Sequence, residues 1–253
     1  MILKRLLAIC FLVILNSCNQ KNYVDKIEGK QISISDSLKS DQQIEAFIAP
    51  YRENIEKDLD SVIAYSANTY SKSDGDLNTA IGNLMADIVY EQANPIFNTR
   101  TGKDIDFVLL NNGGIRSILS KGPVTKRTAY EMMPFENAIV VAELPGAQVM
   151  ELVEYLRSEK RAHPISRLQI IMDQNEDVVF SGIKGKELDF NKNYFVATND
   201  YLFNGGDHMD FFKKNKNVYV LDYKIRNALI DYFVKVDTLN PKIDDRFIIK
   251  NNK

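Results

Sequence analysis

The chain has 253 residues, of which 45% are hydrophobic and 26% are charged, as in globular proteins, so a fibrous or wholly disordered chain is excluded. With 32 Lys and Arg against 34 Asp and Glu, the net charge of -2 provides no positive field, and nucleic acid is not expected as a partner. Only two His and two Cys are present, too few ligands for a dinuclear metal centre or a zinc ribbon. Metal-dependent hydrolysis by this chain alone is therefore not expected.

The beginning of the chain has the pattern of a bacterial secretory signal. Lys4 and Arg5 precede a short apolar run at residues 6–15, which is too short to span a bilayer comfortably. The run ends in Leu15-Asn16-Ser17-Cys18, which resembles the lipoprotein box, where cleavage makes the Cys the first residue and its sulfur is lipidated. We expect a signal peptide at residues 1–17, and the alternative is an ordinary signal followed by an incidental Cys.

The domain boundaries follow from this interpretation. Residues 18–41 begin with the lipidation site Cys18, are polar, and are expected to form a flexible tether. Residues 42–253 are then the folded domain. The protein is expected in the bacterial cell envelope, facing the periplasm or the outside and anchored to the membrane through its lipid.

Apolar residues at three- and four-residue steps predict two amphipathic helices in the first third of the chain. The first covers residues 44–63, where Pro50 is expected to kink or divide it. The second covers residues 77–89, with Asp76 or Asn78 as its cap.

Short apolar runs bounded by turn residues predict the strands of the domain. Further helices are expected after Pro145-Gly146 and from residue 224 to about residue 236. Because helices and strands are intermixed, with hairpin-like neighbours in the middle, the predicted fold class is a mixed-sheet α/β or α+β domain. The predicted strands are residues 105–110, 138–144, 168–172, 178–180, 194–198, 217–221 and 246–249.

A loop of small and polar residues, Asn111-Asn112-Gly113-Gly114-Ile115-Arg116, follows the first of these strands. Its glycines let the backbone approach a ligand closely, and Arg116 offers a planar fork for phosphate or carboxylate. Taken alone, the pattern fits an Asn-Gly turn with a surface Arg better than a binding site.

A second candidate segment, residues 199–207, runs from a strand end into the pair Gly205-Gly206 and a carboxylate. Tyr201 can offer a flat face to a base, and Asp207 can accept hydrogen bonds from ribose hydroxyls. By itself this string is better explained as a turn with a core aromatic.

Between these segments lies Met133-Pro134-Phe135-Glu136-Asn137, in which the proline holds Phe135 in a loop. A loop aromatic can stack on a base while Asn137 hydrogen-bonds the edge of that base, although Phe135 can also be a core residue. Two aromatic rings, an Arg and polar groups for hydroxyls together are what a nucleoside site needs, and stacking on a base contributes roughly 1–3 kcal/mol.

In this order and at this spacing, the three segments resemble the carboxy-terminal domain of the 5'-nucleotidase family. Residues 81–87 (IGNLMAD) are similar to the glycine-asparagine-leucine helix start of that family, and Leu144-Pro145-Gly146 to its turn into a helix. The resemblance covers roughly residues 63–250. It implies the mixed-sheet fold of that domain and a role in nucleotide recognition.

The resemblance also implies roles for individual residues. In this family the catalytic residues and two divalent metals belong to a separate metallophosphoesterase domain. The resemblance therefore implies no catalytic residue, metal ligand or cofactor in this chain. The implied substrate-binding residues are Phe135 and Tyr201 as base clamps, Asn137 at the base edge, Asn111 and Gly114 along the ribose and phosphate side, Asp207 at the ribose hydroxyls and Arg116 at the phosphate.

Two departures concern the phosphate. Family members commonly place another Arg shortly before the glycine-asparagine-leucine helix, but residues 71–79 offer only Lys72. Asn112 also replaces a glycine of the first loop.

Nothing before Ile63 contains the Asp-x-His, Gly-Asp or Gly-Asn-His-Glu strings of a metallophosphoesterase. The leading hypothesis is therefore the nucleotide-recognition half of a split 5'-nucleotidase, with a metallophosphoesterase subunit as partner. The alternative is a tethered nucleoside- or nucleotide-binding lipoprotein without a hydrolytic partner. A stand-alone hydrolase using Asp207 and His208 is least favoured, because adjacent residues of an extended chain point to opposite faces.

Overall fold

The computed structural model describes residues 24–250, so the predicted signal peptide and Cys18 lie outside the described residues. Contacts divide the chain inside helix α2 (Gln42–Leu59), into one part up to Ala49 and a second part from Pro50 onward. Among residues 24–250, the second part holds all the strands and the helices after α2, and it confirms the predicted mixed α/β fold.

Helix α2 begins where the sequence predicts but ends earlier. It continues through Pro50 and stops at Leu59, and strand β1 (Val62–Ser66) follows, so the prediction of a helix as far as Ile63 was wrong. Val62, Ala64, Tyr65 and Ser66 of β1 pair with neighbouring strands instead, and the register shifts at Ile63. No residue of α2 is buried, and Ile44 is 61% exposed. Among the described helices, none has the length and hydrophobicity needed to cross a membrane.

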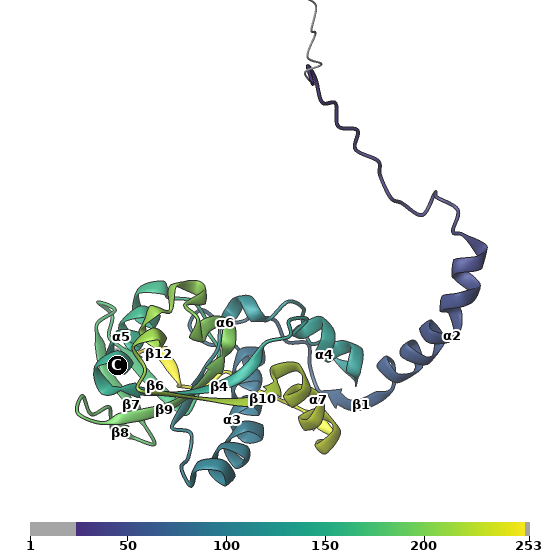
Figure 1. The fold of residues 1–253 in the computed structure, drawn as a ribbon. Coiled ribbons are helices and arrows are strands. Elements are labelled where there is room, and N and C mark those ends of the chain that lie inside the picture. Colours follow the sequence, from purple (N-terminus) through teal and green to yellow (C-terminus); the bar gives the residue numbers. More distant parts are fainter. Residues whose placement is uncertain (1–23, 251–253) are drawn as a thin grey trace, which may run out of the picture. The chain divides into compact units, whose positions relative to one another are not determined.

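The centre of the domain is a five-stranded sheet in the order β10-β4-β9-β2-β5. Figure 1 labels three of these strands, β10, β4 and β9. β2 and β9 are parallel to each other, whereas the other neighbouring pairs are antiparallel. The predicted strands in this sheet are confirmed to within a few residues at their ends. Their bounds are β2 Phe107–Leu109, β4 Ala138–Pro145, β5 Ile165–Ser166, β9 Asn193–Asn199 and β10 Asn217–Lys224.

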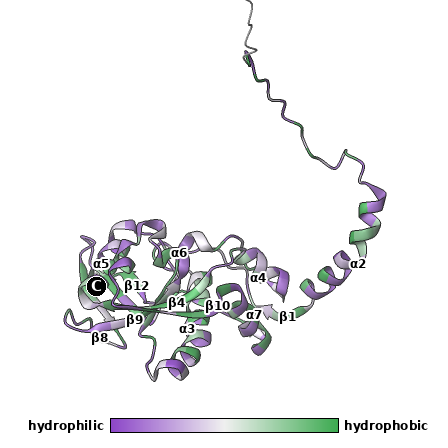
Figure 2. Ribbon diagram, viewed as in Figure 1, coloured by the Kyte–Doolittle hydropathy of each residue, from purple (hydrophilic) through white to green (hydrophobic). Residues whose placement is uncertain are grey.

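Side chains that alternate along these strands fill two cores, one on each face of the sheet. Ile139 and Val141 of β4 pack with α3 (Ala80–Thr101) and α7 (Ile225–Lys235). Ala142 and Leu144 of the same strand pack on the other face with α5 (Gly146–Glu159). Figure 2 shows hydrophobic colouring along the central strands and mixed colouring on the surrounding helices, as this sandwich requires.

Helix α3 is capped by Thr79 rather than by the predicted Asp76 or Asn78. The Thr79 hydroxyl accepts a hydrogen bond from the Gly82 N–H at 3.2 Å, which satisfies one of the free N–H groups at the helix start. The Asn78 side chain serves another purpose, because it donates to the carbonyls of Asp244 and Phe247.

Two smaller sheets complete the domain. The three-stranded sheet has the order β11-β1-β3, with β1 parallel to β11 and antiparallel to β3. The four-stranded sheet, in the order β12-β6-β7-β8, contains the last strand of the chain. Their bounds are β3 Gly122–Thr125, β11 Thr238–Leu239, β6 Leu168–Met172, β7 Val178–Ile183, β8 Lys186–Glu187 and β12 Phe247–Ile249.

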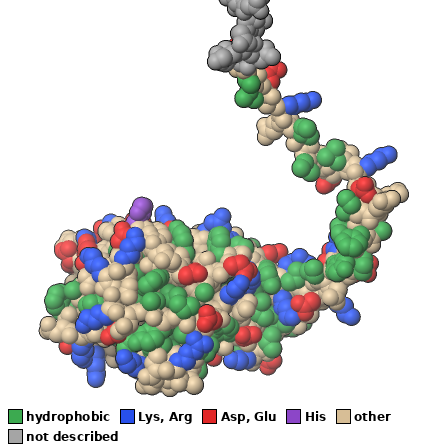
Figure 3. Space-filling model, viewed as in Figure 1, with side chains coloured by type: hydrophobic (Ala, Val, Ile, Leu, Met, Phe, Trp, Pro, Cys, Tyr) green, Lys and Arg blue, Asp and Glu red, His purple; other side chains and the backbone are tan. Residues whose placement is uncertain are grey.

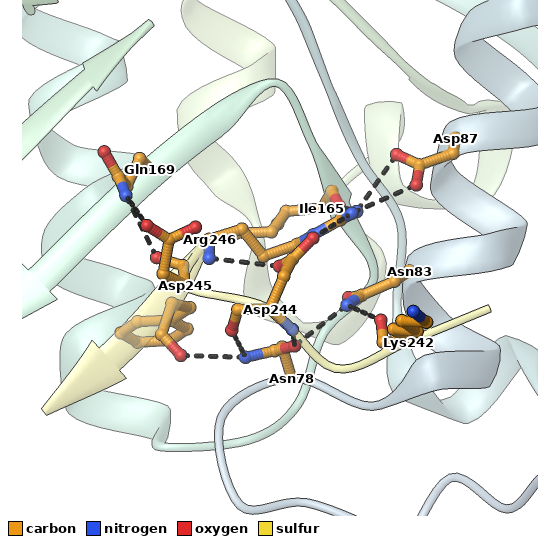
Figure 4. Close-up of polar contacts among 10 residues, drawn as sticks. Asn78, Asn83, Asp87, Ile165, Gln169, Lys242, Asp244, Asp245 and Arg246 are labelled. Carbon is orange, nitrogen blue, oxygen red and sulfur yellow. Dashed lines mark hydrogen bonds and ion pairs between the residues drawn. The ribbon is translucent and has the colours of Figure 1, made fainter. Parts of the chain in front are cut away.

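Polar contacts fasten the end of the chain to the start of α3 (Figure 4). Arg246 donates to both carboxylate oxygens of Asp87 at 3.0 Å and to the Ile165 carbonyl at 2.7 Å, and it also pairs with Asp244. Asn83 donates to the Lys242 carbonyl at 3.0 Å. The contacts of Arg246 with Asp87 and of Asn83 with Lys242 each join residues 159 positions apart, so they connect the end of the domain to its beginning.

Candidate functional site

Three loops of the domain meet at one end of the central sheet, beyond the ends of its strands. Asn111 follows β2 and Tyr201 follows β9, and because these strands are parallel, both residues lie at the same end of the sheet. β4 is antiparallel to β9, so its beginning, next to Phe135 and Asn137, lies at that end as well. Ligands of α/β sheets commonly bind at the carboxyl ends of strands, and the topology explains why segments distant in sequence meet here.

A pocket of about 320 Å³ lies where these loops meet. All seven residues predicted as substrate-binding line this pocket, together with Gly113. The structure therefore brings together every residue of the predicted set, while their binding roles stay predictions. The lining residues are Asn111, Gly113, Gly114, Arg116, Phe135, Asn137, Tyr201 and Asp207.

The carboxylate of Asp207 is held by hydrogen bonds from two other pocket residues. The Asn111 amide donates to one of its oxygens at 2.8 Å, and the Tyr201 hydroxyl donates to the other at 2.9 Å. The hydrogen bond to Asp207 raises the pKa of Tyr201, because loss of the phenol proton would place two negative charges together. Since each carboxylate oxygen can accept more than one hydrogen bond, Asp207 retains acceptor capacity for a ligand.

The turn that carries Asp207 has an unusual backbone. It joins α6 (Asp200–Phe203) to the 3₁₀ turn η2 (Gly206–His208), and Gly205, Asp207 and His208 all have positive φ angles, of 91°, 52° and 59°. A Cβ atom at Gly206 would lie 2.5 Å from the Tyr201 ring, so only glycine lets the chain fold back tightly enough for Asp207 to meet Tyr201. The extended chain predicted at Asp207 and His208 was wrong, because this turn replaces it.

Phe135 lies in the loop between α4 (Lys126–Met132) and β4, as predicted, and the residue is 41% exposed. Arg116 is also exposed, and the centre of its guanidinium lies 5.8 Å from the centroid of the Phe135 ring. The two side chains therefore lie on the same side of the pocket. A cation over an aromatic face is a weakly attractive arrangement at an exposed site, so Arg116 can leave it for an anion.

Tyr155 and His163 lie behind the pocket with ring centroids 5.8 Å apart, and no sequence motif indicated a role for either. The Tyr155 hydroxyl donates to the Asp207 carbonyl at 2.8 Å, and burial raises the pKa of this hydroxyl to about 12. The N–H of Asn112 donates to Nδ1 of His163 at 3.4 Å. These two residues support both polar loops of the pocket from the protein interior.

His163 is a neutral, buried histidine. Burial, with the nearby Arg161, lowers its pKa to about 4, and its Nε2 has no hydrogen-bond partner among the described residues. His163 follows a charged stretch, Glu159-Lys160-Arg161, and a charged neighbourhood usually indicates exposure. Its adjacent residues Ala162 and Pro164 were the available sign of a turn back into the core.

The chemistry of the pocket suits an organic ligand with an aromatic ring and an anionic group. Its polar groups are amides, one carboxylate and one guanidinium, and two exposed aromatic rings accompany them. Within residues 24–250, no group of three or more His, Cys, Asp or Glu side chains is arranged to hold a metal ion. On the face shown in Figure 3, positive and negative side chains are interspersed, so this face has no continuous basic surface.

Comparison with known proteins identifies the family. Residues 60–214 match the family description "5'-nucleotidase, C-terminal domain", and the chain belongs to this family, as the sequence motifs indicated. A 5'-nucleotidase of Vibrio vulnificus is 26% identical over 202 residues, which are 75% of this chain and 34% of that protein. Cell wall protein Lmo0130 of Listeria monocytogenes is 31% identical over 176 residues, 64% of this chain and 22% of that protein.

The fold is also shared with a solved structure. The 5'-nucleotidase precursor from Thermus thermophilus has a TM-score of 0.68 and 23% sequence identity, with coverage of 83% of this chain and 43% of that one. The chain thus spans less than half the length of each of these three relatives.

Proposed function

We propose that this domain recognises a nucleotide. In this proposal Phe135 and Tyr201 clamp the base and Asn137 contacts its edge. Asn111 and Gly114 line the ribose and phosphate side, Asp207 holds the ribose hydroxyls, and Arg116 reaches the phosphate. The observation that carries the proposal is the convergence of two partly exposed rings, a carboxylate and a guanidinium on one pocket. Family membership and the relative named 5'-nucleotidase support the choice of a nucleotide over other aromatic anions.

The dimensions of the pocket agree with this ligand class. A volume of about 320 Å³ lies at the lower end of the range of roughly 300–1,000 Å³ typical of small-molecule sites. Tyr201 is 47% exposed, which leaves its ring accessible for stacking on a base. Each stacking contact contributes roughly 1–3 kcal/mol to binding.

Calorimetry with AMP, adenosine and UDP-glucose tests this proposal. We expect saturable binding that Phe135→Ala or Tyr201→Ala weakens at least about tenfold, as expected when a stacking contact is removed. Asp222→Ala, a substitution on the exposed surface of β10, serves as the control and should bind like the unaltered protein. Binding that survives both aromatic substitutions would refute the base clamp.

We further propose that hydrolysis is supplied by a separately encoded metallophosphoesterase subunit with two divalent metals. The match covers less than half of each of these relatives, which leaves room in them for a second domain. Interfaces between domains resemble transient protein interfaces, so a domain pair can also exist as two chains. The proposal thus concerns a complex in which this domain supplies recognition.

Mixing the purified protein with a candidate metallophosphoesterase tests the split enzyme. Phosphate release from AMP should require both proteins and should fall strongly with Phe135→Ala in this chain. Nucleotide binding without phosphate release in any mixture would favour the tethered binding protein, and phosphate release by this chain alone would favour the stand-alone hydrolase.

We also propose an envelope location with a lipid on Cys18. The relative named cell wall protein Lmo0130 supports the location, and the lipoprotein box supports the lipid. Labelled palmitate should be incorporated into the protein in cells and not into Cys18→Ala. Equal labelling of both would overturn the anchor while leaving the binding proposal intact.

A further inference from the structure

Arg226 contacts the aromatic loop, residues 133–137, from behind the pocket. It belongs to α7, its side chain is only 7% exposed, and it does not line the pocket. One of its terminal nitrogens donates to the Pro134 carbonyl at 3.2 Å, and the other pairs with the carboxylate of Glu136. Pro134 and Glu136 immediately flank Phe135.

Two more contacts tie the same loop to the beginning of α7. The guanidinium of Arg226 lies 4.1 Å from the centroid of the Tyr130 ring. Tyr130 belongs to α4, the helix that leads into the loop. The N–H of Ile225 donates to the Asn137 carbonyl at 3.1 Å. The loop is therefore held at its entry, around Phe135 and at its exit.

The burial of Arg226 needs an explanation. A guanidinium taken out of water is unfavourable unless it is well paired, and an apolar side chain of similar volume often stabilises a fold as well or better. Arg226 has one carboxylate partner, whose side chain is 61% exposed, and its Nε has no hydrogen-bond partner among the described residues. Such a group is poorly suited to stabilising the core, but its planar fork fixes two neighbouring points of the loop at once.

We infer that Arg226 is a positioning residue for base recognition, which holds Phe135 and Asn137 in the arrangement that a base requires. This inference rests on the proposed function. A flexible loop would lose conformational entropy on binding, and a loop that is already held avoids that loss. The affinity for a ligand with a base should therefore depend on Arg226, whereas the affinity for a ligand without a base should not.

The test compares Arg226→Met, Arg226→Lys and Glu136→Gln with the unaltered protein. Arg127→Met is the matched control. Arg127 lies on α4 and, like Arg226, pairs with one carboxylate, but its partner is Asp60, which does not line the pocket. Two quantities are measured: amide hydrogen exchange of residues 133–137 in the free protein, and the affinities for AMP and for ribose 5-phosphate, which lacks a base.

We expect Arg226→Met to accelerate exchange in residues 133–137 and to weaken AMP binding about tenfold, with ribose 5-phosphate affected less than about twofold. Arg226→Lys should recover part of the AMP affinity, and Glu136→Gln should produce the same changes more weakly. Unaltered loop exchange, or equal weakening of both ligands, would overturn the inference.

Two complications have defined outcomes. If Arg226→Met does not fold, Glu136→Gln decides, because the Glu136 side chain is largely exposed and its replacement should leave the fold intact. If the unaltered protein binds no nucleotide, the proposed function fails, while loop exchange still shows whether Arg226 holds the loop.

Discussion

The Tyr201 hydroxyl donates a 2.9 Å hydrogen bond to the carboxylate of Asp207, so the ring proposed to stack on the base also orients the group proposed to hold the ribose. We expect Tyr201→Phe to keep the stacking face and to weaken adenosine binding only about threefold, because the lost hydrogen bond lies within the protein and its absence leaves the Asp207 carboxylate less well oriented. Tyr201→Ala should weaken it at least about tenfold. Calorimetry measures the loss of affinity in each variant. Equal losses would mean that the ring contributes nothing beyond its hydroxyl.

Arg116 should determine how much a phosphate adds to affinity. Arg116→Ala is expected to reduce AMP binding towards that of adenosine and to leave adenosine itself nearly unchanged, because the guanidinium would contact only the phosphate. The preference for AMP should also weaken at high salt in the unaltered protein, since Arg116 is exposed. A similar loss of affinity for AMP and adenosine would mean that Arg116 contacts the base instead, which its position beside Phe135 would allow.

Protonation of His163 should destabilise the fold between pH 6.5 and pH 4. The unfolded chain binds this proton with the ordinary pKa of 6.5, whereas burial lowers the pKa in the folded protein to about 4. The unfolded state therefore holds more protons in this range, and the free energy of unfolding falls as the pH falls. The difference amounts to roughly 3 kcal/mol across the range.

Urea denaturation at a series of pH values checks this prediction. His163→Gln keeps a hydrogen-bond acceptor for the Asn112 N–H but does not titrate, so its stability should depend less on pH than that of the unaltered protein. His208→Gln, at the exposed histidine, is the control. Parallel pH profiles for His163→Gln and the unaltered protein would contradict the prediction.

Arg246 should be important for stability rather than for binding. Its side chain is 15% exposed and joins Asp87, Asp244 and the Ile165 carbonyl, so Arg246→Met leaves several polar groups without their cation. We expect a loss of about 1–3 kcal/mol in urea denaturation, between the values for exposed and for fully buried pairs. Arg127→Met, at a more exposed ion pair, should cost less.

The pH dependence of this stabilisation has a definite sign. Burial acts to raise the pKa of Asp244, but the hydrogen bond and charge of Arg246 outweigh it and hold that pKa below the ordinary 3.8. The contribution is therefore complete above pH 3.8 and is lost as the pH falls through the lower folded-state pKa. In Arg246→Met this loss at acidic pH should be smaller.

The sequence was sufficient for the parts of the fold that local pattern determines. Alternate residues of the strands at 138–144 and 194–198 face two cores, so both faces are apolar and each strand is recognisable in the sequence as a short continuous apolar run. The end of α2 was not predicted, because Ile63 fits the helical stripe equally well. Residues 62–66 form a strand because they pair with β3 and β11, and the local sequence carries no information about these distant partners.

The candidate site shows the same limit. Phe135, Tyr201 and Asp207 were found because loop aromatics and glycine pairs mark places where ligands approach, and the family motif joined them. Arg226 and His163 were not found, since each acts through a contact with a loop distant in sequence. Residues that support a site from behind carry no local motif, and only the folded arrangement identifies them.

The contacts at the end of the chain have a consequence for how this domain is produced. The family match ends at residue 214, yet Phe233, Leu239 and Phe247 beyond it are core residues, and β10 covers the edge of β4. A fragment cut at residue 214 would leave that edge unpaired, which invites aggregation. On the ribosome, the bonds of Arg246 form only after nearly the whole domain has been synthesised, so the core stays open until the final strand has emerged.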